Sequence, residues 1–281
     1  MHTISSVPVS QGLRARAHAV VQDLGAMARL AAQVPRAVGH CHPETIAVPP
    51  PAPSSRQSGP VRPTDTPVLL VHGYLNTEQC WTPLLRRLHR AGFHDTSCLR
   101  YNTLTTGIPQ IAAALTDAAR AAMDRTASGN VHLIGYSLGG LAVRYAVQHL
   151  GLDTGTRTAV TIATPHHGSP WARTAPGIAA AQMRPGSTLL TTLPDLPDLP
   201  DPPGLGDDHS VSWLLLYSDS DPVVPSASAT AGRPARAVRI PGHGHLSLLA
   251  SARTAQTVTA HLRRAETGAA AESRRCLLTA A

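Results

Sequence analysis

Short, continuous apolar runs alternate along the chain with longer segments in which apolar residues recur every three or four positions. The runs predict buried strands, and the periodic segments predict amphipathic helices. The expected strands are residues 68–71, 96–101, 131–134, 158–162, 211–217 and 235–240, and the expected helices are 77–91, 108–126, 138–150 and 246–264. Because strand and helix alternate, the strands should pair in parallel through right-handed crossovers. The pattern predicts an α/β fold whose mostly parallel sheet carries helices on both faces.

Several segments do not follow this alternation and divide the chain into parts. The expected parts are an N-terminal amphipathic helical segment (1–47), a proline-rich linker (48–67), one large domain (68–265) and an alanine-rich, frayed tail (266–281). Within the domain, residues 170–210 interrupt the alternation with short apolar pieces and a repeated Leu-Pro-Asp pattern. We expect this insertion to form a cap or lid.

The amphipathic pattern of the N-terminal segment extends over residues 11–38. The favoured role of this helix is packing on the domain or on a second subunit. The alternative is peripheral contact with an anionic membrane surface through its arginines. The chain shows neither a secretory signal at its start nor an apolar run long enough to cross a bilayer, so a cytoplasmic location is expected.

Composition and charge exclude several classes of function. The formal net charge is +7, but the basic residues are all arginines and are scattered singly or in pairs along the chain rather than clustered. A nucleic-acid partner is therefore not expected. The cysteines show no zinc-site spacing, so neither a metal nor a cofactor is predicted. They are expected to be free thiols, with a Cys80–Cys98 disulfide as the alternative.

Chemically reactive side chains follow the predicted strands. In a parallel sheet, functional residues gather beyond the carboxyl ends of the strands. These positions hold Ser137 inside the string Gly-Tyr-Ser-Leu-Gly, Asp221 in a Ser-Asp-Ser-Asp-Pro string, and His245 in a Gly-His-Gly-His string. A serine hydroxyl needs a base to accept its proton, and an imidazole base needs a carboxylate to orient it. Asp219 and His243 are the local rivals, and we favour Asp221 and His245.

Together, the strings VLLVHGY, GYSLGG, TPHHGSP, SDSDPVVP and PGHGHLSLL resemble the α/β-hydrolase fold and are similar to bacterial triacylglycerol lipases and esterases over residues 67–264. The resemblance implies Ser137 as nucleophile, Asp221 as acid and His245 as base. It also implies an oxyanion hole made by the backbone N–H groups of Leu138 and Tyr74. Further residues expected to line the substrate site are His72, Gly73, Tyr136 and His166. Tyr136 departs from the histidine that often precedes the serine in such lipases.

The function that the resemblance implies is hydrolysis of carboxylic esters, lipid-like or short-chain, through an acyl-enzyme intermediate. An acyltransferase or a thioesterase with the same triad is the first alternative, because the triad serves water and other acyl acceptors alike. The second alternative is a non-catalytic membrane or partner module built on the helix at 11–38. The expected partner is the ester substrate, and the sequence predicts no particular oligomeric state.

Overall fold

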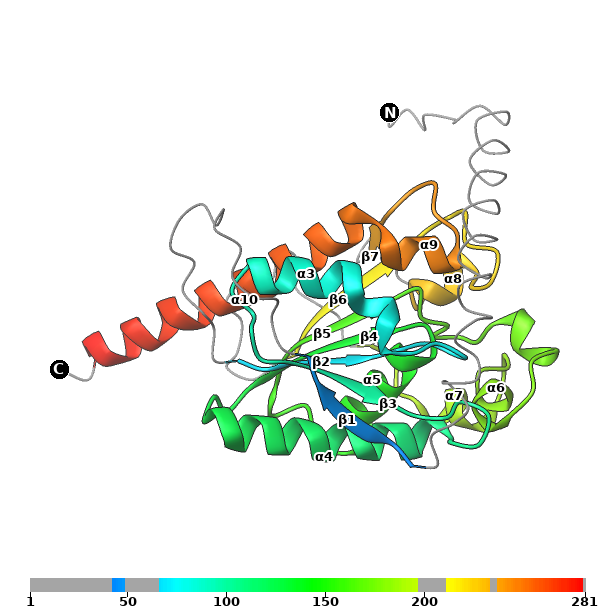
Figure 1. The fold of residues 1–281 in the computed structure, drawn as a ribbon, viewed down its shortest axis with the longest axis horizontal. Coiled ribbons are helices and arrows are strands. Elements are labelled where there is room, and N and C mark those ends of the chain that lie inside the picture. Colours follow the sequence, from blue (N-terminus) through cyan, green and yellow to red (C-terminus); the bar gives the residue numbers. More distant parts are fainter. Residues whose placement is uncertain (1–41, 49–65, 197–210, 233–236, 280–281) are drawn as a thin grey trace.

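A twisted seven-stranded sheet with strand order β1-β3-β2-β4-β5-β6-β7 forms the centre of the computed structural model, which describes residues 42–48, 66–196, 211–232 and 237–279 (Figure 1). The strands are β1 (Glu44–Ala47), β2 (Val68–Val71), β3 (Thr96–Arg100), β4 (Val131–Tyr136), β5 (Thr156–Ile162), β6 (Ser212–Tyr217) and β7 (Ala237–Arg239). Every neighbouring pair is parallel except β1 and β3, which are antiparallel. The predicted α/β fold with a mostly parallel sheet is confirmed.

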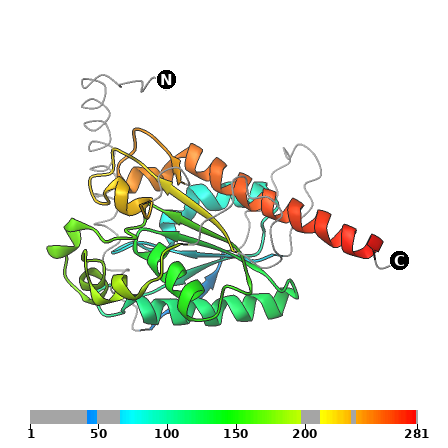
Figure 2. The same ribbon diagram turned by 180° about the vertical axis from the view of Figure 1, so that it is seen from behind.

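Helices cover both faces of this sheet (Figures 1 and 2). One face carries α4 (Ile108–Thr126) and α5 (Leu138–His149), and the other carries α3 (Thr82–Arg90), α9 (His245–Ala250) and α10 (Ala252–Thr279). Strand side chains alternate between the two cores: Leu69 packs with the α4 and α5 residues, whereas Leu70 packs with those of α3 and α10. Because both faces are covered, the strands are continuous apolar runs rather than alternating ones.

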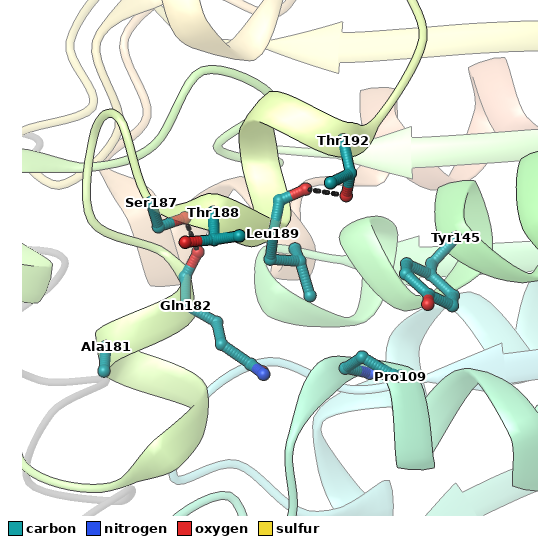
Figure 3. Close-up of a pocket in the computed structure, with 8 residues that line it drawn as sticks. All are labelled: Pro109, Tyr145, Ala181, Gln182, Ser187, Thr188, Leu189 and Thr192. Carbon is teal, nitrogen blue, oxygen red and sulfur yellow. Dashed lines mark hydrogen bonds between the residues drawn. The ribbon is translucent and has the colours of Figure 1, made fainter.

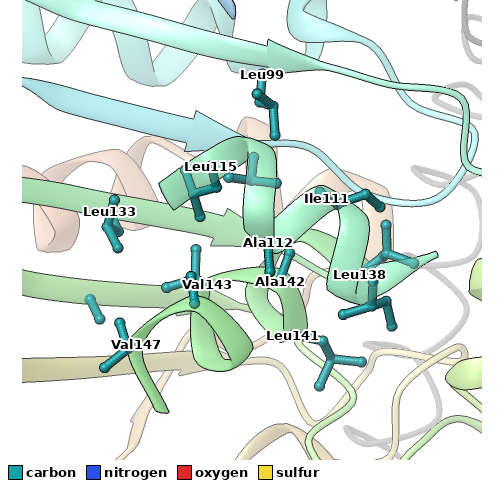
Figure 4. Packing of buried hydrophobic residues seen from close by; sticks show 14 of the residues in the cluster. Leu99, Ile111, Ala112, Leu115, Leu133, Leu138, Leu141, Ala142, Val143 and Val147 are labelled. Atoms are coloured by element: carbon teal, nitrogen blue, oxygen red, sulfur yellow. The ribbon is translucent and has the colours of Figure 1, made fainter. Parts of the chain in front are cut away.

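Small residues let α4 and α5 lie close to each other and to the sheet. Ala112 of α4 and Ala142 of α5 are fully buried in the same cluster as Leu115 and Leu133 (Figure 4). An alanine side chain keeps two helix backbones close without leaving a void, and it costs no side-chain entropy. This packing fixes α5, and therefore the turn at its first residue, against the middle of the sheet.

The remaining elements are short and lie near the carboxyl ends of the strands. They are η1 (Glu78–Trp81), η2 (Pro170–Arg173), α6 (Ile178–Gln182), α7 (Thr188–Thr192) and α8 (Ser226–Ala229). Three of them, η2, α6 and α7, belong to the insertion predicted at 170–210, whose described part ends at Leu196. Buried residues of the insertion, such as Ala179 and Leu189, join the core of the α4 and α5 face. The described part is thus a packed extension of the domain.

The edge strand β1 was not predicted, and it moves the domain boundary. Residues 44–47 were assigned to the helical N-terminal segment, but they pair with β3, with Glu44 opposite Arg100. Their burial is low and does not alternate, because an edge strand packs little side-chain area. The hydrophobic pattern therefore held no signal for this strand. The amphipathic pattern at 11–38 and linker residues 49–65 lie outside the described residues.

The closing helix predicted at 246–264 is two helices. Ser251 has extended backbone (φ −65°, ψ 130°) and separates α9 from α10. Beyond the predicted end, α10 continues to Thr279. The Glu266 carboxylate lies 3.0 Å from His132 Nε2 and 2.7 Å from the Arg157 guanidinium. These contacts attach this part of α10 to strands β4 and β5.

The cysteines and the helix lengths bear on two further questions, a disulfide and a membrane-spanning segment. Cys80 and Cys98 are free thiols, so the disulfide alternative does not hold. Burial raises the pKa of the Cys98 thiol to about 12, which keeps it protonated and unreactive. No helix in the described ranges is both long and apolar enough to cross a membrane.

Candidate active site

Ser137 occupies a sharp turn between β4 and α5. Its backbone has φ 51° and ψ −119°, a conformation that L side chains rarely adopt. Its N–H donates to Ile162 O at 2.8 Å, and its carbonyl accepts the N–H of Gly140 at 3.0 Å. Backbone strain of this kind costs on the order of 1–3 kcal/mol and persists only where the surroundings enforce it. The turn presents the serine side chain at the carboxyl end of the sheet.

Glycines around this turn are required because backbone atoms, and in one case the Thr164 side chain, occupy the space of a Cβ atom. A Cβ atom at Gly135 would lie 2.4 Å from Gly140 Cα, and one at Gly139 would lie 2.0 Å from Val71 O. At Gly140, it would lie 1.9 Å from Thr164 Oγ1. The backbone of α5 therefore lies directly against strands β2 and β4 and against the Thr164 side chain of the loop after β5.

We expect Gly139→Ala to destabilise the fold by about 3 kcal/mol or more, since the new methyl group would overlap a strand carbonyl that cannot move. Gly268→Ala is the matched control. This glycine lies within α10 with nothing within 4 Å of its added Cβ, so alanine there should leave stability unchanged or raise it. Urea unfolding of the two variants measures the difference. Equal midpoints would contradict the packing described for the turn.

The structure brings Ser137, His245 and Asp221 together in one hydrogen-bonded series. His245 Nε2 lies 3.0 Å from Ser137 Oγ, and His245 Nδ1 lies 2.8 Å from Asp221 Oδ2. The other carboxylate oxygen, Asp221 Oδ1, accepts the backbone N–H groups of Val223 at 2.8 Å and Val224 at 3.0 Å. The Asp221 side chain is only 2% exposed, so its charge acts in a dry environment. This arrangement orients the imidazole with Nε2 toward the serine.

The two local rivals lie elsewhere. Asp219 forms an ion pair with Arg239 at 2.5 Å, and its side chain is 44% exposed. His243 Nε2 lies 2.8 Å from Ser251 Oγ at the end of α9. Neither of these contacts involves Ser137, His245 or Asp221.

The predicted oxyanion donors flank the serine. Leu138 follows Ser137 as the first residue of α5, and the loop after β2 carries Gly73 and Tyr74 to the same place. A Cβ added at Gly73 would lie 3.2 Å from Ser137 Cβ, which shows how closely this loop approaches the nucleophile position. The next residue, Leu75, has a positive φ of 51°, and its N–H donates to Thr103 Oγ1 at 3.2 Å.

Thr103 was not singled out from the sequence. It lies after β3, belongs to no recognisable motif, and supports the loop that carries Tyr74.

The aromatic residues expected to line the substrate site are buried beneath it. His72 is 1% exposed, stacks on Tyr101 with ring centroids 4.1 Å apart, and lies with Nδ1 2.9 Å from Gly73 O. Tyr136 is also 1% exposed, and its hydroxyl donates to His245 O at 3.1 Å. These side chains support the loop at Gly73 and the backbone of His245. In this conformation their burial corrects the expectation that they contact substrate.

His166 is likewise buried rather than exposed to substrate. It is 1% exposed, with Nε2 3.2 Å from Thr161 Oγ1, and burial, reinforced by Arg144, holds its pKa well below the ordinary value. Its loop is attached to the loop of Asp221, because Ser228 Oγ donates to Gly168 O at 2.7 Å and accepts the His167 N–H at 3.0 Å. His166 is therefore a neutral structural residue between these loops. No group of three or more potential metal ligands occurs among the residues whose placement is described.

A cavity of about 490 Å³ lies between the insertion and helices α4 and α5 (Figure 3). Leu189 and Pro109 contribute apolar groups to its lining, and the Gln182 amide and the Tyr145 hydroxyl contribute polar groups. The residues that line the cavity are Pro109, Tyr145, Ala181, Gln182, Ser187, Thr188, Leu189 and Thr192. Ser137, His245 and Asp221 are not among these residues. The cavity lies along α5, two turns beyond the serine.

Comparison with known proteins agrees with the fold. Residues 68–189 match the alpha/beta hydrolase family. Bacillus licheniformis lipase BlEst2 in its mature form is 16% identical and superposes with a TM-score of 0.55, covering 79% of this chain and 98% of the lipase. An esterase from Thermogutta terrifontis is 16% identical with a TM-score of 0.52, covering 79% of this chain and 93% of the esterase.

A third structure, an alpha-beta serine hydrolase homologue from Coxiella burnetii, is 13% identical with a TM-score of 0.50, covering 79% of this chain and 90% of the homologue. No curated protein matches the sequence. With the parallel sheet and the turn at Ser137, these findings make the chain a protein of the α/β-hydrolase fold, as the resemblance implied.

Proposed function

We propose that this protein is a serine carboxylic ester hydrolase. The observation that carries the proposal is the hydrogen-bonded series Ser137, His245 and Asp221, assembled from three loops at the carboxyl end of the sheet. A serine, a base and a buried acid in this geometry are the groups that acyl transfer requires. The fold by itself hosts many activities, so the series and not the fold supports the reaction.

In the first half of the proposed reaction, Ser137 Oγ attacks the ester carbonyl carbon while His245 Nε2 takes the serine proton. Asp221 stabilises the imidazolium that forms, because its carboxylate lies 2.8 Å from His245 Nδ1. The carbonyl oxygen becomes an oxyanion, for which the N–H groups of Leu138 and Tyr74 are the proposed donors. The carbon–oxygen bond to the alcohol then breaks, and His245 gives its proton to the leaving alcohol.

In the second half, water replaces the alcohol. His245 removes a proton from the water, whose oxygen attacks the acyl carbon of the serine ester. The same donors stabilise the second oxyanion. The bond to Ser137 Oγ breaks, the proton on His245 returns to the serine, and the carboxylic acid leaves. In each half, His245 Nε2 first accepts a proton and then donates it. Asp221 must therefore hold the imidazole ring in one orientation throughout the reaction.

The surface beside this series favours esters with an apolar acyl or alcohol part. Trp171 and Ile178 are the large apolar side chains exposed in the described part of the chain, at 44% and 49%, and both belong to the insertion. The Trp171 ring packs edge-on against Tyr74 with centroids 5.7 Å apart, and the Tyr74 hydroxyl donates to Pro176 O at 2.5 Å. An apolar surface therefore adjoins the proposed oxyanion loop, as a lipid-like substrate would require.

A rate series over nitrophenyl esters from acetate to palmitate, in solution and in emulsion, tests the function and the chain-length preference together. We expect turnover of at least part of the series and covalent labelling of Ser137 by a fluorophosphonate probe. Failure of both turnover and labelling would contradict a serine hydrolase. Labelling with transfer to an added alcohol or thiol in preference to water would favour the acyltransferase or thioesterase alternative instead.

A further inference from the structure

The reaction proposed above has no use for Arg144, although this side chain is buried in the nucleophile helix α5. It is 2% exposed, and burial lowers the pKa of its guanidinium to about 10, an effect that the charge of Asp195 opposes. Arg144 forms no ion pair with a carboxylate of the residues described. A buried cation without a paired anion is costly unless its N–H groups are all engaged. A leucine or methionine would fill the same volume without this cost.

The guanidinium instead binds the two ends of the described insertion. Nη1 donates to His166 O at 3.3 Å, in the loop that leads from β5 into the insertion. Nη2 donates to the carbonyls of Leu193, at 3.5 Å, and Pro194, which follow α7 directly. One side chain thus holds the entry of the segment and the residues after its last helix against α5, although they are more than 20 positions apart in the chain.

Gln148, one turn further along α5, completes this contact. Its Oε1 accepts Arg144 Nε–H at 3.0 Å, which fixes the plane of the guanidinium. Its amide nitrogen donates to Pro194 O at 3.1 Å and to Asp195 O at 3.5 Å. We call Arg144 and Gln148 the α5 clamp.

The clamp adjoins the cavity of Figure 3. Tyr145, the neighbour of Arg144, forms one wall of this cavity, and residues 187–192 around α7 form the opposite wall. The clamped carbonyls begin at Leu193, directly after α7, so the clamp is attached to the end of the segment that forms this opposite wall.

We propose that the α5 clamp positions the insertion over the nucleophile helix and thereby determines which acyl chain lengths the site accepts. Arg144 and Gln148 are positioning residues in this proposal. The chain-length part rests on the proposed ester hydrolysis, whereas the positioning part does not.

Hydrogen exchange of Gln148→Ala and Arg144→Gln tests the positioning part without any substrate. Both variants remove hydrogen bonds made by the charged Arg144 guanidinium. The rate of amide hydrogen exchange in the insertion should therefore rise by about 10-fold or more. Faster exchange should appear at the amides of Ala172, Met183 and Thr191, while strand β4 is unchanged. Arg87→Gln, at an exposed position on α3, is the control and should exchange like the wild type. Unchanged exchange of the insertion in Gln148→Ala, or equally faster exchange throughout the domain, would overturn the proposal.

The ester series then tests the chain-length part. In Gln148→Ala, we expect the ratio of kcat/KM for the long-chain esters to that for the acetate to change at least about 5-fold, roughly what a lost contact in a substrate pocket produces. The acetate rate itself should stay within about 2-fold of the wild type, because the triad is not altered. A uniform change across the series would contradict a role in specificity. If the wild type hydrolyses no ester, the proposed function fails, and the exchange result still decides whether the clamp positions the insertion.

Discussion

Ser137→Ala should abolish ester hydrolysis, with kcat falling by about 10⁶-fold, the usual loss when a triad nucleophile is removed. The reason is that Ser137 Oγ is the atom proposed to form the acyl bond, and it is the hydroxyl oxygen that lies 3.0 Å from His245 Nε2. The fold should persist, because alanine occupies the same backbone position with less side-chain volume. The measurement is the hydrolysis rate of the best nitrophenyl ester, with the thermal unfolding midpoint as the check of folding.

Ser226→Ala is the matched control for this variant. Ser226 lies at the same edge of the sheet, at the start of α8, and its side chain takes no part in the series of Ser137. We expect this variant to retain wild-type turnover and to be labelled by the fluorophosphonate, whereas Ser137→Ala is not labelled. Wild-type turnover in a folded Ser137→Ala protein would disprove the proposed mechanism.

Asp221→Asn should lower kcat by about 10⁴-fold, while Asp219→Asn should leave it nearly unchanged. An amide in place of the carboxylate donates toward His245 Nδ1 and favours the tautomer that cannot accept the serine proton. Asp221 Oδ1 also accepts two backbone N–H groups, so some stability should be lost as well. Asp219 contributes an exposed ion pair with Arg239, which is worth at most about 1 kcal/mol.

The comparison of the two asparagine variants separates the candidates directly, because they differ by two positions in one loop. Both rates should be measured with the same ester under the same conditions. If Asp219→Asn were the inactive variant, the acid of the triad would have to be reassigned.

Local patterns were sufficient for the six strands other than β1, for the helices α3, α4 and α5, and for the turn at Ser137. The strand β4, the glycines and the helix α5 are contiguous, so the sequence signal for the turn lies within ten positions of the serine, although the distant residues Val71 and Thr164 also confine it. The edge strand β1 and the break at Ser251 were missed for the opposite reason. The partner of β1 lies about 50 residues away on β3, and Ser251, where the backbone turns extended, contacts His243 through its hydroxyl.

The sequence by itself determined the α/β architecture and the order of serine, acid and base, because hydrophobic periodicity and glycine spacing are local properties of the chain. Only the tertiary structure showed that Asp221 contacts His245 whereas Asp219 contacts Arg239, that His72, Tyr136 and His166 are buried, and that the insertion is attached to Arg144. Each of these depends on atoms from segments distant in sequence that meet at one edge of the sheet. Hydrogen bonding and burial there are set by distances that no local pattern encodes.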